Sequence, residues 1–308
     1  MLPIEPRVLM GLLFARDRHA YKHEGAKMKH LMKWSALVSG LVLASQAGAA
    51  VISYTDFSSV AGLTINGNAA QAGNVLRVTP ANFSQSGSAF STSTVSLASN
   101  ASFSTYFQFR FTSAGGSCDG LGCGADGLVF VVQTVGNNVG GIGGGIGYQG
   151  IPNSVGIEFD TWNNGGGDNN SSNHIGIDIN GSVTSVVLTE VTEADMNDGD
   201  IWNAWVDYNS ATQMLEARLT RSAVRPSTAL LSYAVDLATV LGTTNAYVGF
   251  TSGTGAAYAN HDVLSWTLED RFAPIGGGGN TVPEPGSLLL LGTGLVLAGA
   301  MRRRRAEA

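Results

Sequence analysis

The sequence predicts an all-β protein whose central residues form one antiparallel β-sandwich. Two observations carry this prediction: short stretches alternate apolar and polar residues with a period of two, and Gly, Ser and Asn clusters separate them. Charged residues make up only 13% of the 308 residues, about half the usual share, which argues against a coiled coil or a soluble helical bundle. A hydrophobic content of 44% excludes disorder over most of the chain.

The first segment has the layout of a secretory signal peptide that begins at Met28. Lys29 and Lys33 form a basic region, an apolar stretch follows, and residues 47–49 are small, as at a cleavage site. A transmembrane anchor is the alternative, but the apolar run is short for a bilayer. We expect residues 1–49 to be an upstream extension plus a signal peptide, with Met28 the true start of an exported protein.

The next 222 positions, residues 50–271, contain the predicted strands of the sandwich. In residues 101–111 every second side chain, from Phe103 to Phe111, is Phe or Thr and faces the same way. Residues 202–208 and 214–220 predict a hairpin across a polar turn. Further predicted strands are 155–159, 175–179 and a last pair, 247–251 with 263–268. Three tryptophans are assigned to the core: Trp202, Trp205 and Trp266.

The last segment consists of a Gly-rich linker, residues 272–281, and a membrane-directed tail, residues 282–308. The apolar run of the tail is marginal for a membrane span, and the arginines after it stay cytoplasmic. The order of Pro283-Glu284-Pro285, a short apolar span and the four arginines Arg302–Arg305 resembles the PEP-CTERM sorting signal of Gram-negative, exopolysaccharide-making bacteria. That resemblance implies tethering in the inner membrane, processing by an exosortase-type protease, and delivery to the cell surface or extracellular matrix; an ordinary tail anchor is the alternative. The residues that carry the signal are Pro283, Glu284, Pro285, Arg302, Arg303, Arg304 and Arg305.

The formal net charge of −6 is unevenly distributed along the chain. Residues 50–300 hold 6 Arg and 19 Asp or Glu, a net charge of 6 − 19 = −13, and no Lys follows Lys33. A body this acidic repels phosphate backbones, which disfavours nucleic acid as a partner. It suits divalent cations or neutral ligands better.

The chain contains two cysteines, Cys118 and Cys123, with four residues between them. In an exported protein this pair predicts a disulfide that stabilises the loop leading to Asp126. The spacing and the lack of a second pair disfavour a metal-binding cysteine motif.

Acidic side chains and a histidine cluster between residues 157 and 180. Glu158 and Asp160 share one face of a strand, the following loop can return Asp168 beside them, and His174 opens the next strand. Three carboxylates without a Lys or Arg repel one another unless a cation neutralises them. His with carboxylates suits a transition ion, and carboxylates with amide and carbonyl oxygens suit Ca²⁺. A polar surface loop with solvated acids is the alternative.

This segment resembles the metal-binding segment of L-type (legume-type, concanavalin A-like) lectins. Three further stretches resemble the family's motifs, in the family's order: ADGLVF at 125–130, a Gly-rich turn at 143–148, and a closing segment at 246–266 that ends in HDVLSW. The resemblance implies the concanavalin A-like jelly roll and a carbohydrate-binding protein that is not an enzyme.

The resemblance also implies two metal sites and a sugar site. The implied ligands of a transition ion, expected to be Mn²⁺, are Glu158, Asp160, Asp168 and His174. Those of a neighbouring Ca²⁺ are Asp160, the Trp162 carbonyl, Asn164 and Asp168. The implied sugar contacts are Asp126 as acceptor, the Gly144 N–H and the Asn164 amide as donors, Trp162 as the stacking ring, and Ala256.

Alternatives stay open at several of these positions. Asp126 could cap a turn, the glycines at 143–145 could serve close packing, and Asn169 or Asn170 could replace part of the role of Asp168. A structural matrix or adhesion protein with a decayed sugar site is a second function. A glycoside hydrolase is a third, but related hydrolases have Glu-x-Asp-x-x-Glu on one strand, and Asn163 stands where the second Glu belongs. The sugar preference and the oligomeric state are left open.

Overall fold

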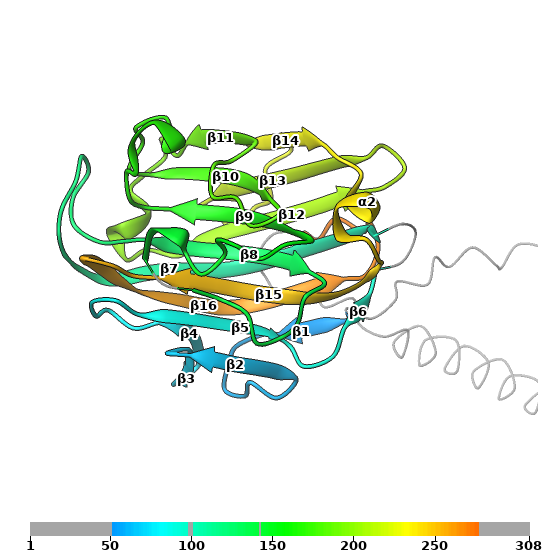
Figure 1. Cartoon of the computed structure of the whole chain (residues 1–308), viewed down its shortest axis with the longest axis horizontal. Helices are drawn as coiled ribbons and strands as arrows, with labels where there is room; N and C mark the ends of the chain where they lie inside the picture. The colour runs from blue at the N-terminus through cyan, green and yellow to red at the C-terminus, as the bar shows by residue number, and fades with distance from the viewer. Residues whose placement is uncertain (1–50, 98–100, 142, 277–308) are drawn as a thin grey trace, which may run out of the picture. The chain divides into compact units, whose positions relative to one another are not determined.

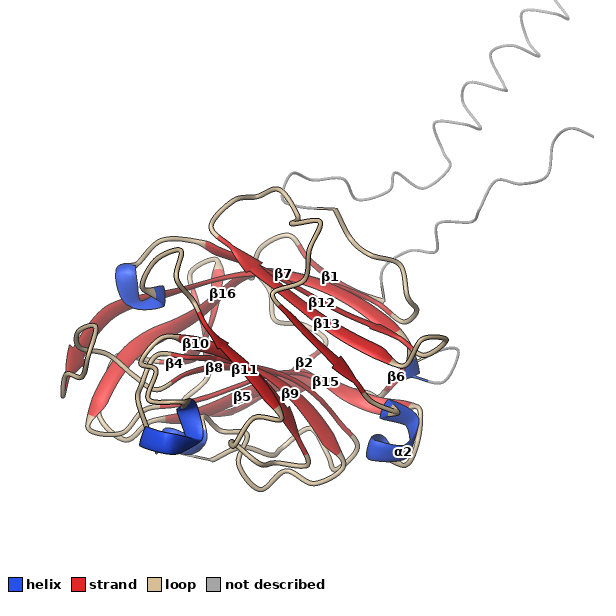
Figure 2. Ribbon diagram, turned by 90° about the horizontal axis from the view of Figure 1, so that it is seen from above, coloured by secondary structure: helices blue, strands red, loops and turns tan. Residues whose placement is uncertain are grey.

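The computed structural model describes residues 51–97, 101–141 and 143–276. Within these residues two antiparallel sheets pack face to face, which confirms the predicted all-β sandwich (Figures 1 and 2). The predicted signal peptide, the residues 277–281 of the linker and the sorting tail lie outside the described residues. No helix within the described ranges is long and apolar enough to cross a membrane.

We name the two sheets A and B. In spatial order, sheet A consists of β14 (Leu231–Ala234), β13 (Met214–Thr220), β12 (Trp202–Asn209), β7 (Phe103–Gly116), β16 (Ala257–Glu269), β4 (Val75–Thr79) and β3 (Ala70–Ala72), with β1 (Ile52–Tyr54) paired to β16. Sheet B consists of β11 (Val187–Glu190), β10 (His174–Ile179), β9 (Ser154–Asp160), β8 (Gly127–Gln133), β15 (Asn245–Gly253), β5 (Ser86–Ser91) and β2 (Leu63–Gly67), with β6 (Val95–Ser96) paired to β15. The short helices are η1 (Gly143–Gly145), η2 (Gly165–Asp168), η3 (Met196–Asp198) and α2 (Leu237–Leu241).

The core between the sheets contains a group of aromatic rings in contact with one another, several of them from the alternating residues of 101–111. Phe107 of sheet A lies between rings of sheet B, with its centroid 5.0 Å from that of Phe250 and 5.7 Å from that of Phe159. Both contacts are edge-to-face, a geometry worth about 0.5–1.5 kcal/mol per pair beyond the burial of the rings. The two sheets are therefore held together by a continuous aromatic layer.

The three predicted core tryptophans are all fully buried, but they do not share one environment. Trp202 and Trp266 belong to the core between the sheets. Trp205 does not, because its neighbours on β12, Ala204 and Val206, point into that core and side chains alternate along a strand. It packs on the outer face of sheet A against Tyr106, at 5.0 Å between ring centroids. The prediction that all three tryptophans are buried is confirmed, and Trp205 is buried outside the cluster between the sheets.

The predicted hairpin of residues 202–208 and 214–220 is confirmed, because β12 and β13 pair antiparallel. The prediction that 247–251 and 263–268 form a pair of strands is wrong. These residues lie in β15 and β16, which belong to different sheets. The three residues between the two strands, 254–256, cross from sheet B to sheet A, so each strand finds its partners elsewhere.

Strand register fixes which loops share an end of the sandwich. Gly127 at the start of β8 pairs with Asp160 at the end of β9 and with Gly253 at the end of β15. We call this end the loop end. At the far end, Ile52 pairs with Leu268, so the described chain enters and leaves the sandwich there. Strand β7, with 14 residues, spans the distance between the ends, about 45 Å at 3.3 Å per residue.

Candidate metal and ligand site

The loop end holds a cluster of one imidazole and two carboxylates. Glu158, Asp160 and His174 each offer a ligand atom, and these atoms all lie within 4.8 Å of one another. Asp160 pairs with His174 across the β9–β10 ladder, and Glu158 lies two residues earlier on the same face. Glu158 Oε1 is 3.4 Å from His174 Nε2. The structure therefore brings together three of the four residues predicted for the transition ion.

The fourth residue, Asp168, lies at the end of η2 with its carboxylate turned inward. Its Oδ2 accepts a hydrogen bond from the Asn164 N–H at 2.5 Å, and its side chain is buried. Asn169 and Asn170, the alternatives left by the sequence, are exposed. Burial raises the pKa of Asp168, with the Glu158 charge adding to the shift and His174 opposing it.

Two further predicted residues, Trp162 and Asn164, follow β9. The Trp162 N–H donates to Asp160 Oδ1 at 2.6 Å, so the chain turns directly after the strand. Trp162 is half-buried and Asn164 is exposed, which leaves both side chains accessible from solvent. The turn holds the Asn164 side chain on the rim of the site rather than in the core.

The electrostatics of the cluster are those of a cation site. Burial raises the pKa of Asp160 well above its ordinary value, and the neighbouring Glu158 carboxylate raises it further. Both ring nitrogens of His174 are buried and find no hydrogen-bond partner among the described residues. Within those residues arginines pair with other carboxylates: Asp198, Asp200, Asp207, Glu216, Asp262, Glu269 and Asp270. The donor set fits a divalent cation, because that ion would offset the crowded charges and occupy the orphaned imidazole.

Two residues beside the cluster escaped the sequence prediction. Ser185 Oγ donates at 2.5 Å to Glu158 Oε1 and lies 2.7 Å from Asp178 Oδ1. Asp178 was detectable, because it follows His174 by four positions on β10 and so shares its face. Ser185 was not, because it comes from the loop after β10, whose path the sequence does not reveal. Burial raises the pKa of Asp178, and the Glu158 charge adds to this.

Asp126 lies immediately before β8 and carries an unpaired buried oxygen. Its backbone is fixed on both sides, since its N–H donates to Gly253 O at 3.1 Å and its carbonyl accepts from Thr161 N at 3.0 Å. The side chain is 5% exposed, and Oδ2 has no hydrogen-bond partner among the described residues. Burial raises the pKa of Asp126 to about 7. Such an acceptor is available to a ligand that brings hydrogen-bond donors.

Backbone from two other loops surrounds this carboxylate. A Cβ placed on Gly255 would lie 3.8 Å from Asp126 Oδ2 and 3.9 Å from the Cα of Gly143. A Cβ placed on Gly144 would lie 2.7 Å from the Asn164 amide nitrogen, so the Gly144 backbone lies directly beside that amide. The structure thus groups Asp126, Gly144 and Asn164, and exposed Ala256 follows Gly255 on the rim.

The loop between β7 and β8 carries a disulfide between Cys118 and Cys123. Inside that loop Asp119 Oδ2 accepts the Asn163 N–H at 2.8 Å, which connects the loop to the turn after β9. Asp119 is a further site residue that no motif signals, because the contact joins positions 44 residues apart.

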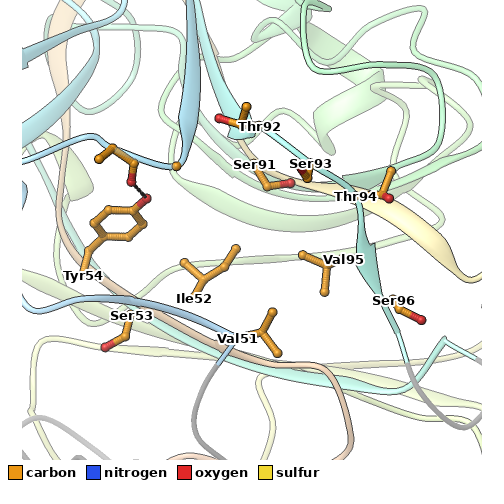
Figure 3. A pocket seen from close by; sticks show the side chains of 12 residues that line it. Val51, Ile52, Ser53, Tyr54, Ser91, Thr92, Ser93, Thr94, Val95 and Ser96 are labelled. Atoms are coloured by element: carbon orange, nitrogen blue, oxygen red, sulfur yellow. Dashed lines mark hydrogen bonds between the residues drawn. The ribbon is translucent and has the colours of Figure 1, made fainter.

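The far end holds a separate cavity of about 510 Å³. It lies between residues 51–54 and 91–96 and is lined by small hydroxyl and aliphatic side chains (Figure 3). No charged side chain lines it, and the Tyr54 hydroxyl is already bonded to Ala61 O at 2.7 Å. The chemistry of the molecule is therefore concentrated at the loop end.

Comparisons with known proteins agree with the geometry. A model of the legume lectin domain matches residues 50–276, and the PEP-CTERM protein-sorting motif matches residues 281–305. An L-type lectin-domain containing receptor kinase, VIII.1 of Arabidopsis thaliana, is 31% identical over 225 residues, which cover 71% of this chain and 29% of the kinase. Bark agglutinin I polypeptide B of Robinia pseudoacacia is 35% identical over 192 residues, covering 59% of this chain and 62% of that protein. The chain thus spans less than two thirds of the length of these relatives.

Solved structures show the same relationship in three dimensions. The lectin from Bauhinia forficata in complex with GalNAc has a TM-score of 0.61 at 27% identity, covering 70% of this chain and 96% of that one. The metal-free form of lectin I-B4 from Griffonia simplicifolia has a TM-score of 0.59 at 25% identity, covering 71% and 98%. The chain therefore belongs to the legume lectin domain family, and it carries a PEP-CTERM sorting motif at its C-terminal end.

Proposed function

We propose that this protein binds carbohydrate at the loop end, in a metal-dependent and non-catalytic way. The observation that carries the proposal is Asp126 Oδ2, a buried acceptor without a partner that faces the loops of Gly144 and Asn164. A sugar offers vicinal hydroxyl donors to such an acceptor and takes hydrogen bonds from N–H groups beside it. Its apolar face can stack on half-buried Trp162.

Metal ions have a supporting role in this proposal. Glu158, Asp160, Asp168 and His174 would hold a transition ion such as Mn²⁺. Asp160, Asp168, the Asn164 amide and the Trp162 carbonyl would hold Ca²⁺. Bound ions supply positive charge that keeps these carboxylates ionised. The contacts to the sugar come from the protein: the loop after β9 brings Asn164 next to Gly144, and the carboxylate of Asp126 stays free to accept hydrogen bonds from sugar hydroxyls.

Several features support a binding protein over an enzyme. Asn163 occupies the position where related hydrolases carry their second carboxylate, and its amide nitrogen donates to Asn170 O at 2.8 Å. Hydrolysis needs an acid and a second carboxylate across the scissile bond. The carboxylate near Asp126 is that of Asp160, which this proposal assigns to the metal ions and not to acid–base chemistry.

The proposed location is outside the cytoplasm. Export would use the signal peptide that begins at Met28, and residues 50–271 would fold as the binding domain. The sorting motif would hold the protein in the inner membrane until an exosortase-type protease cuts near Pro283–Pro285. The released or tethered domain would then bind exopolysaccharide or a cell-surface glycan.

A glycan array tests this function. The exported protein, with Ca²⁺ and Mn²⁺ present, is compared with Asp126→Asn and with the surface control Asp56→Asn. We expect the wild type and the control to bind a common set of sugars, with GalNAc the first candidate because the Bauhinia lectin was solved with it. Asp126→Asn should bind none. Binding that survives Asp126→Asn refutes the site, and a wild type that binds no glycan favours a structural protein with a decayed site.

A further inference from the structure

A pair of aromatic rings lies at the loop end, outside the site proposed above. The Phe83 side chain is 55% exposed, and its ring meets that of Tyr258 edge to face, with 4.8 Å between the centroids. Tyr258 points to the outer face of sheet A, because its neighbours on β16, Ala257 and Ala259, are buried in the sandwich. We call Phe83 and Tyr258 the aromatic pair.

The loop that carries Phe83 has a fixed backbone, although the side chain is exposed. This loop connects β4 of sheet A to β5 of sheet B, and beside it the loop from β15 to β16 crosses between the same two sheets. Hydrogen bonds join the two loops. The Ser84 N–H donates to Gly255 O at 3.1 Å, and the Thr254 N–H donates to Gln85 O at 3.0 Å. Because the backbone is already held, a ligand that covers the Phe83 ring would lose little affinity to ordering of the loop.

The Tyr258 ring is held in place by the backbone of β7. Tyr258 pairs with Gly115 across the ladder between β7 and β16. A Cβ placed on Gly115 would lie 2.9 Å from Tyr258 Cε2, closer than Cβ atoms come to other groups, so the ring lies directly against this glycine. Phe83 thus packs against a ring that has a fixed position, and the aromatic pair is in place before any ligand binds.

The segment between Asp126 and the aromatic pair has almost no side chains. A Cβ placed on Gly255 would lie 3.8 Å from Asp126 Oδ2, and Gly255 O accepts the Ser84 N–H at 3.1 Å. With standard covalent distances, these two contacts place the Cα of Phe83 no more than about 13 Å from Asp126 Oδ2. Ala256, the next residue of this segment, is exposed and offers only a methyl group. A ligand held at Asp126 can therefore extend towards Phe83 without meeting a bulky side chain of this segment.

The surroundings of the aromatic pair favour a sugar over a protein as its ligand. Asn82 and Ser84 flank Phe83 and are both exposed, so amide and hydroxyl groups border the ring. A sugar residue has the matching surface, an apolar C–H face edged by hydroxyl groups. A stable protein interface buries about 1,200–2,000 Å², whereas two aromatic side chains alone supply at most about 500 Å².

We infer that the aromatic pair is a second sugar subsite, which stacks on a further residue of a glycan chain held at Asp126. This inference rests on the proposed carbohydrate-binding function and makes its ligand an oligosaccharide rather than a single sugar. Each pyranose residue adds roughly 5 Å to a glycan chain, from its bond lengths. The second or third residue, counted from the one at Asp126, therefore reaches Phe83, and its C–H face replaces water on the exposed ring.

The test measures how affinity depends on the length of the glycan. The exported protein, with Ca²⁺ and Mn²⁺ present, is titrated with the methyl glycosides of galactose, glucose, mannose and GalNAc. It is also titrated with α- and β-linked di-, tri- and tetrasaccharides that end in each of these sugars. For a sugar that binds, the preferred trisaccharide should bind about tenfold more tightly than the methyl glycoside, which is about 1.4 kcal/mol and within the range of one aromatic contact.

Three variants assign this gain in affinity to the aromatic pair. Phe83→Ala should abolish the gain and leave the affinity for the methyl glycoside unchanged, whereas Phe83→Trp should retain the gain because it keeps an aromatic face. Phe272→Ala is the matched control. It removes another exposed phenylalanine, 43% exposed, from the far end, where the next residue bonds to Ser104. This control should behave as the wild type.

The possible results separate this inference from the proposed function. A gain with chain length that survives in Phe83→Ala overturns the inference, and so does equal affinity for the methyl glycoside and every oligosaccharide. A phenyl glycoside that gains affinity through Phe83 while the oligosaccharides gain none also overturns it, since the ring then binds an apolar aglycone. In each of these cases the proposed function stands if Asp126→Asn still abolishes binding. No binding of any glycan by the wild type overturns the proposed function and this inference with it.

Discussion

Replacing Asp126 should make the metal-free protein more stable at neutral pH while it removes sugar binding. Burial raises the pKa of Asp126 from 3.8 to about 7, so the folded state prefers the protonated carboxyl. A group with a raised folded-state pKa contributes its full stabilisation below 3.8 and loses it as the pH rises towards 7. Between pH 5 and pH 7 the loss is about 2 kcal/mol, because the slope of 1.36 kcal/mol per pH unit falls to half as the pH reaches the folded-state pKa. Asp126→Asn has no carboxyl to ionise and escapes this loss.

The measurement is urea unfolding of wild type and Asp126→Asn at pH 5, 6, 7 and 8. EDTA is present throughout, because a nearby cation would lower the pKa of Asp126. The stability difference should grow in favour of the variant from pH 5 to pH 7 and then level off. Shifts from Asp168 and Asp178 occur in both proteins and cancel, whereas the Asp126 charge contributes to the raised pKa of Asp160, so that smaller contribution is lost in the variant. Asp56→Asn serves as control, because hydrogen bonds from Ser58 lower the pKa of this surface carboxyl. Parallel pH profiles for wild type and Asp126→Asn would refute the reasoning.

Three further predictions concern the ions and the loop that supports them. EDTA should lower the melting temperature and abolish glycan binding, with recovery on adding Ca²⁺ and Mn²⁺; unchanged values for both would exclude a metal requirement. Metal content measured by mass spectrometry should fall as the pH drops to 4, because the carboxylates and His174 bind metal only when deprotonated; full occupancy at pH 4 would contradict the assigned ligands. Asp119→Ala removes a charge-assisted hydrogen bond worth about 1.5–3 kcal/mol, so the Ca²⁺ affinity measured by calorimetry should fall about tenfold or more. The Ca²⁺ affinity of the double variant Cys118→Ser/Cys123→Ser should also fall, because the disulfide holds the loop that carries Asp119. Affinity equal to that of Asp56→Ala would show that the Asp119 contact does not support the site.

The sequence predicted those parts of the molecule that depend on local periodicity. The alternation around Phe107 and the hairpin of β12 and β13 follow from a period of two and a polar turn, and both are confirmed. The sequence-based prediction of strand pairing failed where the partner of a strand is chosen by contacts between distant parts of the chain. The separation of β15 from β16 into different sheets depends on which strands each of them meets in space, and no local pattern shows this.

In the candidate site, too, the residues in local motifs were predicted and those brought in by distant loops were not. Asp126, Glu158, Asp160 and His174 were predicted because they lie at or near strand ends in recognisable motifs, and Asp168 because it follows in the loop after β9; the structure places all five at one end of the sandwich. Ser185 and Asp119 were not found. Each reaches the site from a loop whose path is set by packing against residues distant in the sequence, so no local pattern marks it.

The separation between the loop end and the far end determines how a tethered copy can work. The described chain leaves the sandwich beside Ser104, where the Ala273 N–H donates to Ser104 Oγ at 3.0 Å, and the sorting motif follows from residue 281. Strand β7 separates this exit from the loop end by about 45 Å. In the proposed location, the membrane attachment would be at the far end of the sandwich and the proposed binding loops at the opposite end. If the proposed function holds, one membrane attachment and one binding site per chain would link the cell envelope to a polymer, and cleavage of the tail would release the domain while it stays bound to that polymer.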